Sequence, residues 1–216
     1  MEQGHPSETT GVPSREKCID PYLRCAFNGA AQTALGVSGS ALLAHSPQGC
    51  EYLVNNAFAL QECDYMETVT LCTKLCVDEI VHGGEELLAR TIREARDLPI
   101  SVLFVISACG PEIVGDDIRA VCETLQPEVK FRLIPIQSPG FRGSQYDGID
   151  SALDTILKSL VKENNEKIPH SVCLIAPHAN ANPTWTADLA WVKQVLSRMG
   201  VQVVATLTHR TPLSEI

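Results

Sequence analysis

The sequence predicts an α/β fold, with a Rossmann-like parallel sheet, flanking helices and then the start of a second Rossmann-like domain. Strand-length apolar runs alternate with helical patterns along the 216 residues, as in chains that build parallel sheets. The strongest run, 101–107 (SVLFVIS), is almost continuously apolar and β-branched. Such a run is typical of a strand that is buried on both faces of a parallel sheet.

The expected elements follow in chain order. Apolar runs of strand length lie at 41–45, 79–82, 101–107, 130–136, 171–176 and 201–207. Helical patterns lie at 26–35, 51–60, 85–96, 117–125, 150–162 and 186–199. The stretch 138–147 is expected to be a glycine-rich loop, and Gly200 to end the last helix. The strand at 79–82 is expected to end at the glycine pair 83–84.

The order of elements predicts three parts. Residues 1–17 are polar and read as a flexible N-terminus, 18–163 as one α/β domain, and 168–216 as the first strand–helix–strand of a second. A surface linker of charged and amide residues separates the two domains. A single strand–helix–strand cannot cover both faces of a parallel sheet. The second part must therefore pack on the first domain or open a longer domain cut at Ile216, and we favour the cut.

Composition excludes several classes of function. The net charge is −9 and the 17 Lys and Arg are scattered, which argues against a nucleic-acid surface because that requires a basic stripe. No apolar run reaches the roughly 18 to 20 residues that span a bilayer. The polar N-terminus does not resemble a signal peptide, so a cytoplasmic protein is expected.

Nine cysteines, an odd number without an export signal, favour thiolate ligation of metal over disulfides.

Three cysteines share a local setting. Cys25 precedes the helix at 26–35, Cys50 lies between a turn and the helix at 51–60, and Cys109 follows the strand at 101–107. Open α/β sheets bind cofactors at the carboxyl ends of their strands, and helix N-termini stabilise anionic sulfur. None of the three belongs to a Cys-x-x-Cys pair, so zinc-ribbon and ferredoxin spacings are absent. Spacing alone is a weak metal signal, and most cysteines of a chain are simply small buried hydrophobes.

The remaining thiols have a functional and a structural interpretation. Cys72 and Cys76 would share a helix face and, with Cys63, could form a second metal site; we favour a structural or incidental role. Cys18, Cys122 and Cys173 are expected to be core or surface thiols.

Several polar residues have competing roles. Asp116 and Asp117 are expected to place negative charge at a helix N-terminus rather than to act as an acid and a base. His45 could orient the turn before Cys50 by hydrogen bonding, and a role in proton transfer is the lesser alternative. Arg142 could neutralise a cofactor carboxylate, a phosphate or cluster charge, or be an exposed loop arginine. We expect His178 and His209 to be structural or exposed.

Five segments carry a family resemblance, in order along the chain: 25–30, 45–50, 81–86, 109–117 and 140–144. Together they resemble the nitrogenase component 1 family, the superfamily of the molybdenum-iron protein α and β subunits. Residues 25–30 (CAFNGA) resemble its first ligand segment and 45–50 (HSPQGC) its H-G-P-x-G-C segment. Residues 81–86 (VHGGEE) resemble its F-G-G-E turn, 109–117 (CGPEIVGDD) its C-x-x-x-x-I-G-D-D segment, and 140–144 (GFRGS) a loop near its active-site cavity. The resemblance runs from about residue 18 to 216, which would be the N-terminal portion of such a subunit.

The resemblance implies that Cys25, Cys50 and Cys109 ligate an iron–sulfur cluster, [4Fe-4S] or larger, at a subunit interface. Three thiolates leave one iron of a cubane without an outer ligand, so a second component 1-type subunit, identical or paralogous, should complete the site. In the family, electrons arrive from an ATP-driven iron–sulfur reductase protein. The chain is thus expected to be a subunit of a nitrogenase-like oxidoreductase.

One departure narrows this expectation. A histidine follows the Gly-Phe-x-Gly loop in the molybdenum-iron α subunit, and the stretch 144–150 (SQYDGID) has none. Dinitrogen reduction is therefore unsupported, and the catalytic residues stay unassigned. A reductase of a tetrapyrrole or of another unsaturated or sulfur-containing substrate is favoured. A scaffold for cofactor assembly and a non-catalytic fragment remain as alternatives.

Overall fold

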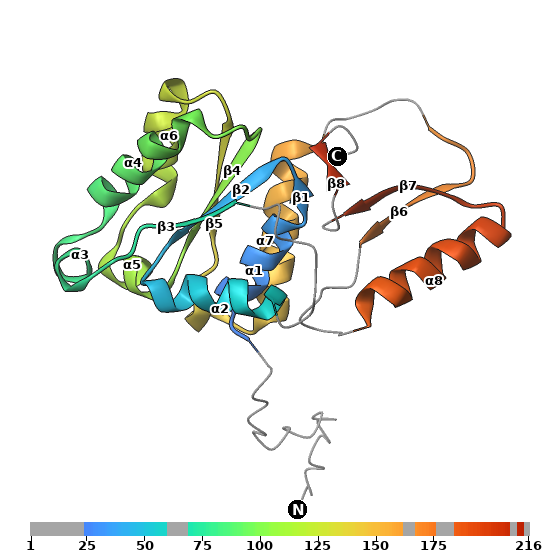
Figure 1. Ribbon diagram of the computed structural model, residues 1–216, viewed down its shortest axis with the longest axis horizontal. Coiled ribbons are helices and arrows are strands. Elements are labelled where there is room, and N and C mark those ends of the chain that lie inside the picture. Colours follow the sequence, from blue (N-terminus) through green and yellow to red (C-terminus); the bar gives the residue numbers. More distant parts are fainter. Residues whose placement is uncertain (1–23, 60–68, 162–166, 176–183, 208–210, 214–216) are drawn as a thin grey trace, which may run out of the picture.

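The computed structural model describes residues 24–59, 69–161, 167–175, 184–207 and 211–213. Its centre is a four-stranded parallel sheet of order β3-β2-β4-β5 (Figure 1). The strands are β2 (Ser40–His45), β3 (Val69–Cys72), β4 (Val102–Ser107) and β5 (Arg132–Gln137). The fold class expected from the sequence is confirmed. The segment expected to be flexible, 1–17, lies outside the described residues.

The two central strands carry the apolar runs of the sequence. Every residue of β2 and β4 is buried, because each strand has a neighbour on both edges and helices on both faces. The two strands pair in register from Ser40 opposite Val102 to His45 opposite Ser107. The carboxyl ends of β2 and β4 therefore reach the same edge of the sheet.

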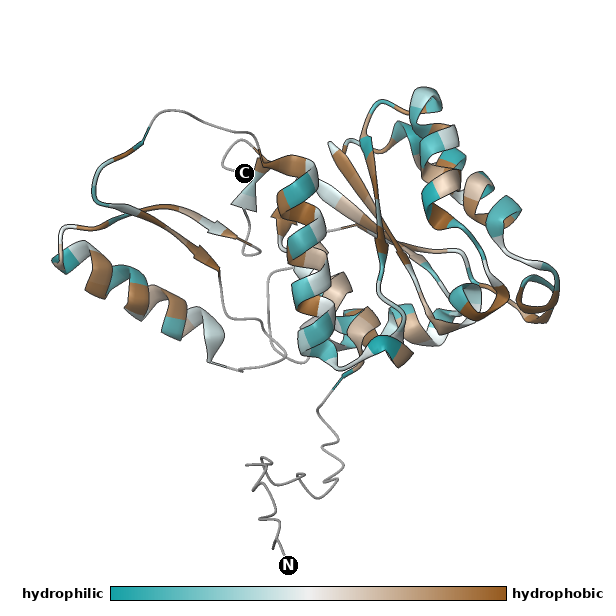
Figure 2. Cartoon of the chain, turned by 180° about the vertical axis from the view of Figure 1, so that it is seen from behind, coloured by the Kyte–Doolittle hydropathy of each residue, from teal (hydrophilic) through white to brown (hydrophobic). Residues whose placement is uncertain are grey.

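Helices cover both faces of this sheet. The first face carries α1 (Ala26–Leu35), α2 (Gln48–Ala59) and α7 (Gln145–Leu160), and the second carries α4 (Glu85–Glu94) and α6 (Ile118–Leu125). Alternate strand residues feed two separate apolar clusters, one under each layer. Figure 2 shows the strands as mostly hydrophobic and the outer helices as mixed, as expected for helices that bury one stripe.

Short elements connect these layers. Two short helices follow β3 and β4, namely α3 (Val77–His82) and α5 (Cys109–Val114). Turns of 3-10 helix span Ala95–Asp97, Gln126–Glu128 and Gly140–Arg142. Among the described residues, no helix is both long and apolar enough to cross a membrane.

The prediction of a strand at 79–82 is wrong, since these residues lie in α3. The strand that precedes α4 is β3, which lies upstream of α3. The Glu79 carboxylate accepts a hydrogen bond from the Cys76 backbone N–H at 2.9 Å, which closes the first turn of a helix. The helix ends before Gly83, whose φ of +96° favours glycine. Two adjacent apolar residues in a run of four do not distinguish one helical turn from a strand.

Helix α7 also begins earlier than expected, at Gln145 instead of residue 150. The Ser144 backbone N–H and hydroxyl both donate to the Asp147 carboxylate, at 2.7 and 2.8 Å, and form a capping box. The glycine-rich stretch before it is therefore shorter than the sequence pattern suggested.

The C-terminal part forms the expected strand–helix–strand. Strands β6 (Ser171–Ile175) and β7 (Gln202–Leu207) pair in parallel and are connected through α8 (Trp185–Arg198). Trp185 is 2% exposed and belongs to the apolar cluster of the first unit. A final strand, β8 (Thr211–Pro212), pairs with β1 (Val37–Ser38).

Two glycines allow α1 and α7 to touch backbone to backbone. A Cβ at Gly29 would lie 1.9 Å from the carbonyl oxygen of Gln145, and one at Gly148 would lie 1.9 Å from that of Ala26. Both clashes involve backbone atoms, which cannot rotate away. The approach of the two helices therefore requires glycine at both positions.

The substitution Gly148→Ala should lower the free energy of unfolding by about 3 kcal/mol, because the helices would have to separate. Gly49→Ala is the matched control: Gly49 lies in α2, and a Cβ added there would meet nothing within 4 Å. Because alanine favours a helix over glycine by up to about 1 kcal/mol, Gly49→Ala should be as stable as the wild type or slightly more stable. Chemical denaturation of both variants checks the difference, and equal stabilities would contradict the close contact of the two helices.

Candidate functional site

The three cysteines expected as ligands begin helices at one edge of the sheet. Cys25 is the N-cap of α1, Cys50 lies in the first turn of α2, and Cys109 is the first residue of α5. Cys50 follows β2 and Cys109 follows β4, so the parallel register brings both to the carboxyl edge. Cys25 reaches it from another direction, because it forms an isolated β-bridge with Ser144 at the start of α7.

Gly140 marks the point where Cys25 and Cys109 meet. A Cβ at this glycine would lie 3.1 Å from the sulfurs of both cysteines, so the two sulfurs are no further apart than twice that distance. Glycine thus leaves open the space between two thiols that are distant in sequence. No sequence pattern points to Gly140 itself, although it opens the GFRGS segment.

Cys50 belongs electrostatically to the same group. Burial raises the pKa of its thiol, and the nearby thiols of Cys25, Cys109 and Cys72 raise it further. Negative charge on one sulfur therefore opposes negative charge on the next. A set of thiolates at this place requires a cation to balance it.

A single metal ion does not suit these thiols. Within the part of the chain that the structure describes, no three His, Cys, Asp or Glu side chains lie close enough together to hold one ion. In an iron–sulfur cluster the cysteine ligands bind different irons, so their sulfurs can lie further apart than the ligands of a single ion. The approach of the Cys25 and Cys109 sulfurs to Gly140, with Cys50 close enough to feel both thiols, fits such a group.

Arg142 lies on the turn that carries Gly140, but its guanidinium already has protein partners. It forms an ion pair with Glu112 at 3.6 Å and donates to the carbonyl oxygen of Gln137 at 3.3 Å. Glu112 lies in α5 and also accepts from the hydroxyl of Ser107. Arg142 thus balances a carboxylate close to Cys109, and its contact with a cofactor stays a prediction. No sequence pattern had indicated a role for Glu112.

His45 is linked to the Cys50 turn through an intermediate hydroxyl and not by a direct hydrogen bond from its ring. Its ring is fully buried, with Nε2 2.9 Å from the Asp116 carboxylate and Nδ1 3.2 Å from the hydroxyl of Thr73. That hydroxyl, rather than the histidine ring, accepts the backbone N–H of Ser46 at 3.1 Å. The histidine ring acts on the turn only through Thr73.

The adjacent aspartates have different roles. Asp117 caps α6 as expected, accepting from the backbone N–H groups of Arg119 and Ala120 at 3.0 Å. Asp116 was expected to do the same and does not. Its buried carboxylate accepts from Gly84 N–H and lies against His45.

The other cysteines divide between the site and the core. Cys72 ends β3 and Cys76 caps α3, so they do not share a helix face as expected. Cys72 is close enough to influence Cys50, which the sequence did not reveal. Burial raises the pKa of Cys122 to about 12, as for an inert core thiol, and Cys173 is exposed in β6. Outside the described residues lie Cys18, Cys63, His178 and His209.

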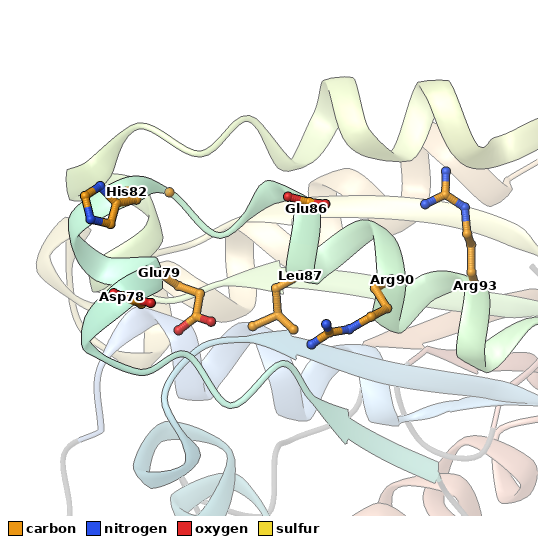
Figure 3. Close-up of a pocket in the computed structure, with 8 residues that line it drawn as sticks. Asp78, Glu79, His82, Glu86, Leu87, Arg90 and Arg93 are labelled. Carbon is orange, nitrogen blue, oxygen red and sulfur yellow. The ribbon is translucent and has the colours of Figure 1, made fainter.

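A separate polar groove of about 560 Å³ lies along α3 and α4 (Figure 3). Two of its charged side chains are already paired, because Glu79 caps α3 and Arg93 binds Glu128 at 2.8 Å. The thiols do not line it. Its lining residues are Asp78, Glu79, His82, Gly83, Glu86, Leu87, Arg90 and Arg93.

Comparison with known proteins gives a consistent result. Residues 25–216 match a family described as nitrogenase component 1 type oxidoreductase. The nitrogenase iron-molybdenum cofactor biosynthesis protein NifE of Bradyrhizobium diazoefficiens is 32% identical over 189 residues, covering 85% of this chain and 34% of that protein. The nitrogenase molybdenum-iron protein alpha chain of Methanothermococcus thermolithotrophicus is 30% identical over 207 residues, covering 89% of this chain and 42% of that protein.

A solved structure agrees in fold. Nitrogenase Cp1 at pH 5 superposes with a TM-score of 0.70 at 23% identity, over 89% of this chain and 40% of that one. The chain therefore spans less than half the length of the relatives it matches.

The buried histidine predicts how stability depends on pH. Burial lowers the pKa of His45 below its ordinary value of 6.5, against the opposing effects of Asp116 and Glu85. Below pH 6.5 the unfolded chain gains a proton at this position before the folded chain does. Stability should therefore fall as the pH drops through this window, with a slope of up to about 1.4 kcal/mol per pH unit.

The variant His45→Gln removes this titration, and its side-chain amide can still donate and accept hydrogen bonds as the imidazole does. Denaturation curves between pH 7 and 5 should show a shallower loss of stability for the variant. Identical slopes would mean that His45 does not contribute to the pH dependence.

Proposed function

The chain belongs to the nitrogenase component 1 type oxidoreductase family, and we propose that it is the cluster-holding part of a nitrogenase-like reductase subunit. In this proposal Cys25, Cys50 and Cys109 bind an iron–sulfur cluster, [4Fe-4S] or larger, that is shared with a second component 1-type subunit. Electrons would come from an ATP-driven iron–sulfur reductase protein. The observation that carries the proposal is the convergence of Cys25 and Cys109 on Gly140, with Cys50 as their electrostatic neighbour.

The residues of this chain contribute ligation and placement. When bound, the cluster would store and pass on single electrons. Cys50 must lose its proton to become a ligand, against a raised pKa, so loading with iron should release protons and weaken in acid. The Glu112–Arg142 pair places a balanced carboxylate and cation beside the Cys109 helix.

Exposed apolar side chains support a partner at this edge. They occur on the same elements as the thiols: Tyr52 and Leu53 on α2 are 64% and 42% exposed, and Ile113 on α5 is 74% exposed. Phe141 beside Gly140 and Tyr146 on α7 are also more than half exposed. Aromatic and aliphatic side chains gathered around a polar site are typical of an interface core.

A role in building a metal cofactor is the second candidate. The similarity to the cofactor biosynthesis protein NifE supports it, and such a scaffold would use the same interface cluster. The two roles differ in outcome. A reductase turns substrate over when supplied with its electron donor, whereas a scaffold retains or releases a metal cofactor without turnover.

The first test is the iron content of anaerobically purified protein, measured with sulfide and with absorption near ~400 nm, which is typical of iron–sulfur clusters. Cys50→Ala should remove most of the iron and weaken association with the partner subunit, because a bridging cluster links ligation to assembly. Cys173→Ala, an exposed thiol in β6, is the control and should change neither. Retention of full iron would remove Cys50 from the ligand set.

The second test fills the space between the sulfurs. Gly140→Ala places a methyl group 3.1 Å from the sulfurs of Cys25 and Cys109, so iron content should fall while all three thiols are retained. The melting temperature of the metal-free variant should stay close to that of the metal-free wild type, because the turn is at the surface. Unchanged iron in Gly140→Ala would place the cluster elsewhere.

A further inference from the structure

The carboxylate of Asp116 joins three segments that are distant in sequence. One oxygen lies 2.9 Å from His45 Nε2 at the end of β2. Both oxygens accept from the backbone N–H of Gly84, at 2.9 and 3.0 Å, just before α4. Asp116 itself lies between α5 and α6, and its own backbone N–H donates to the carbonyl oxygen of Pro111 in α5 at 3.0 Å. Its side chain is 4% exposed.

His45 thereby holds α5 at both ends. The Ala108 backbone N–H, one residue before Cys109, donates to the carbonyl oxygen of His45 at 3.0 Å. Beyond the other end of α5, Asp116 contacts the imidazole ring of the same histidine. One residue of the central strand β2 is thus the anchor for the residues that precede and follow the Cys109 helix.

The surroundings leave the ring and the carboxylate little freedom. A Cβ at Gly84 would lie 2.9 Å from His45 Cε1 and 3.0 Å from the Asp116 carboxylate. On its other side the ring contacts the Thr73 hydroxyl, which accepts the Ser46 N–H. With Asp116 ionised and His45 neutral, Nε2–H donates to the carboxylate and Nδ1 accepts from Thr73. Each polar atom of this buried group then has a partner.

We propose that Asp116 is a positioning residue for Cys109: through His45 and Gly84 it fixes the short α5 helix, and so the thiol at its start, relative to Cys25 and Cys50. The role of Cys109 as a cluster ligand rests on the proposed function. The fixing of its helix is a property of the metal-free chain and can be measured without a cluster. Cys25 is held separately, through α1, α7 and the bridge to Ser144.

The test compares Asp116→Ala with Asp117→Ala in the full chain. Asp117 is the adjacent residue with the same side chain, but it caps α6 instead of binding the histidine ring. Both variants lose hydrogen bonds to a carboxylate, so both should be less stable. Alkylation of the metal-free protein by iodoacetamide, followed by peptide mass spectrometry, gives a separate rate for each thiol.

In Asp116→Ala, alkylation of Cys109 should accelerate by roughly tenfold, because α5 opens locally more often. Alkylation of Cys25 should stay within roughly twofold of the wild-type rate, since α1 is fixed by other contacts. In Asp117→Ala the Cys109 rate should remain near that of the wild type. Equal acceleration of Cys109 in both variants, or of Cys25 and Cys109 together, would overturn the proposal.

Two further variants keep the test decisive if Asp116→Ala does not fold. Asp116→Asn keeps one oxygen that can accept from Gly84 N–H, and the neutral imidazole can exchange tautomers and accept from the amide. Its NH2 group still faces the Gly84 N–H, which both carboxylate oxygens accept in the wild type, so alkylation of Cys109 should accelerate by clearly less than tenfold. Gly84→Ala leaves every charge in place and presses a methyl group on His45, on Asp116 and on the end of the Leu75 side chain. It should therefore accelerate the alkylation of Cys109 but not that of Cys25. An unchanged Cys109 rate in Gly84→Ala would contradict the positioning role.

Iron content separates this proposal from the proposed function. If the cluster is present, Asp116→Ala should lower iron by more than Asp117→Ala does. If the wild-type chain, purified anaerobically together with its partner subunit, carries no iron, the proposed function fails. The alkylation rates still decide whether Asp116 positions Cys109.

Discussion

The backbone contact between α1 and α7 is the constraint on which the site depends. Cys50 and Cys109 reach the sheet edge because parallel strands end together, but Cys25 precedes a helix and has no strand to place it. Gly29 and Gly148 let the two helices meet without intervening side chains. The start of α7 then pairs with Cys25 through Ser144, and the turn before α7 brings Gly140 against its sulfur. A distant helix contact thus completes a set of thiols.

Electrostatics limits what could stabilise these thiols in their deprotonated form. Arg142, the cation on the turn beside the thiols, is already paired with Glu112. It therefore offsets a carboxylate and adds little net positive charge for the sulfurs. Burial is the main cause of the raised pKa of Cys50, and the thiols of Cys25, Cys109 and Cys72 raise it further. Iron ions supply concentrated positive charge that a surface arginine cannot, so binding metal and losing the thiol protons are coupled events.

The parts of the structure that depend on periodicity and on chain order were predictable from the sequence. The strand at 101–107 and the helix at 26–35 lie where expected, because a long apolar pattern has one compatible period. Residues 79–82 were misassigned because one helical turn is too short to show a period, and its capping by Glu79 depends on local geometry. The Asp116–His45 contact spans 71 positions of sequence. No local pattern indicates which of two adjacent aspartates turns inward.

The exposure of the thiols limits what this unit can do by itself. Cys25 is exposed, and Cys50 and Cys109 are only partly buried. A cluster held there by these residues would still face solvent on the side away from the sheet. The exposed aromatic and aliphatic side chains on α2, α5 and the turn at Gly140 lie on the elements that present these thiols. A single apposed surface could therefore both exclude water from the cluster and cover these side chains. The proposed partner subunit would supply such a surface. Both proposed roles, reductase and assembly scaffold, place the same demand on this unit, because each would enclose the cluster between two chains.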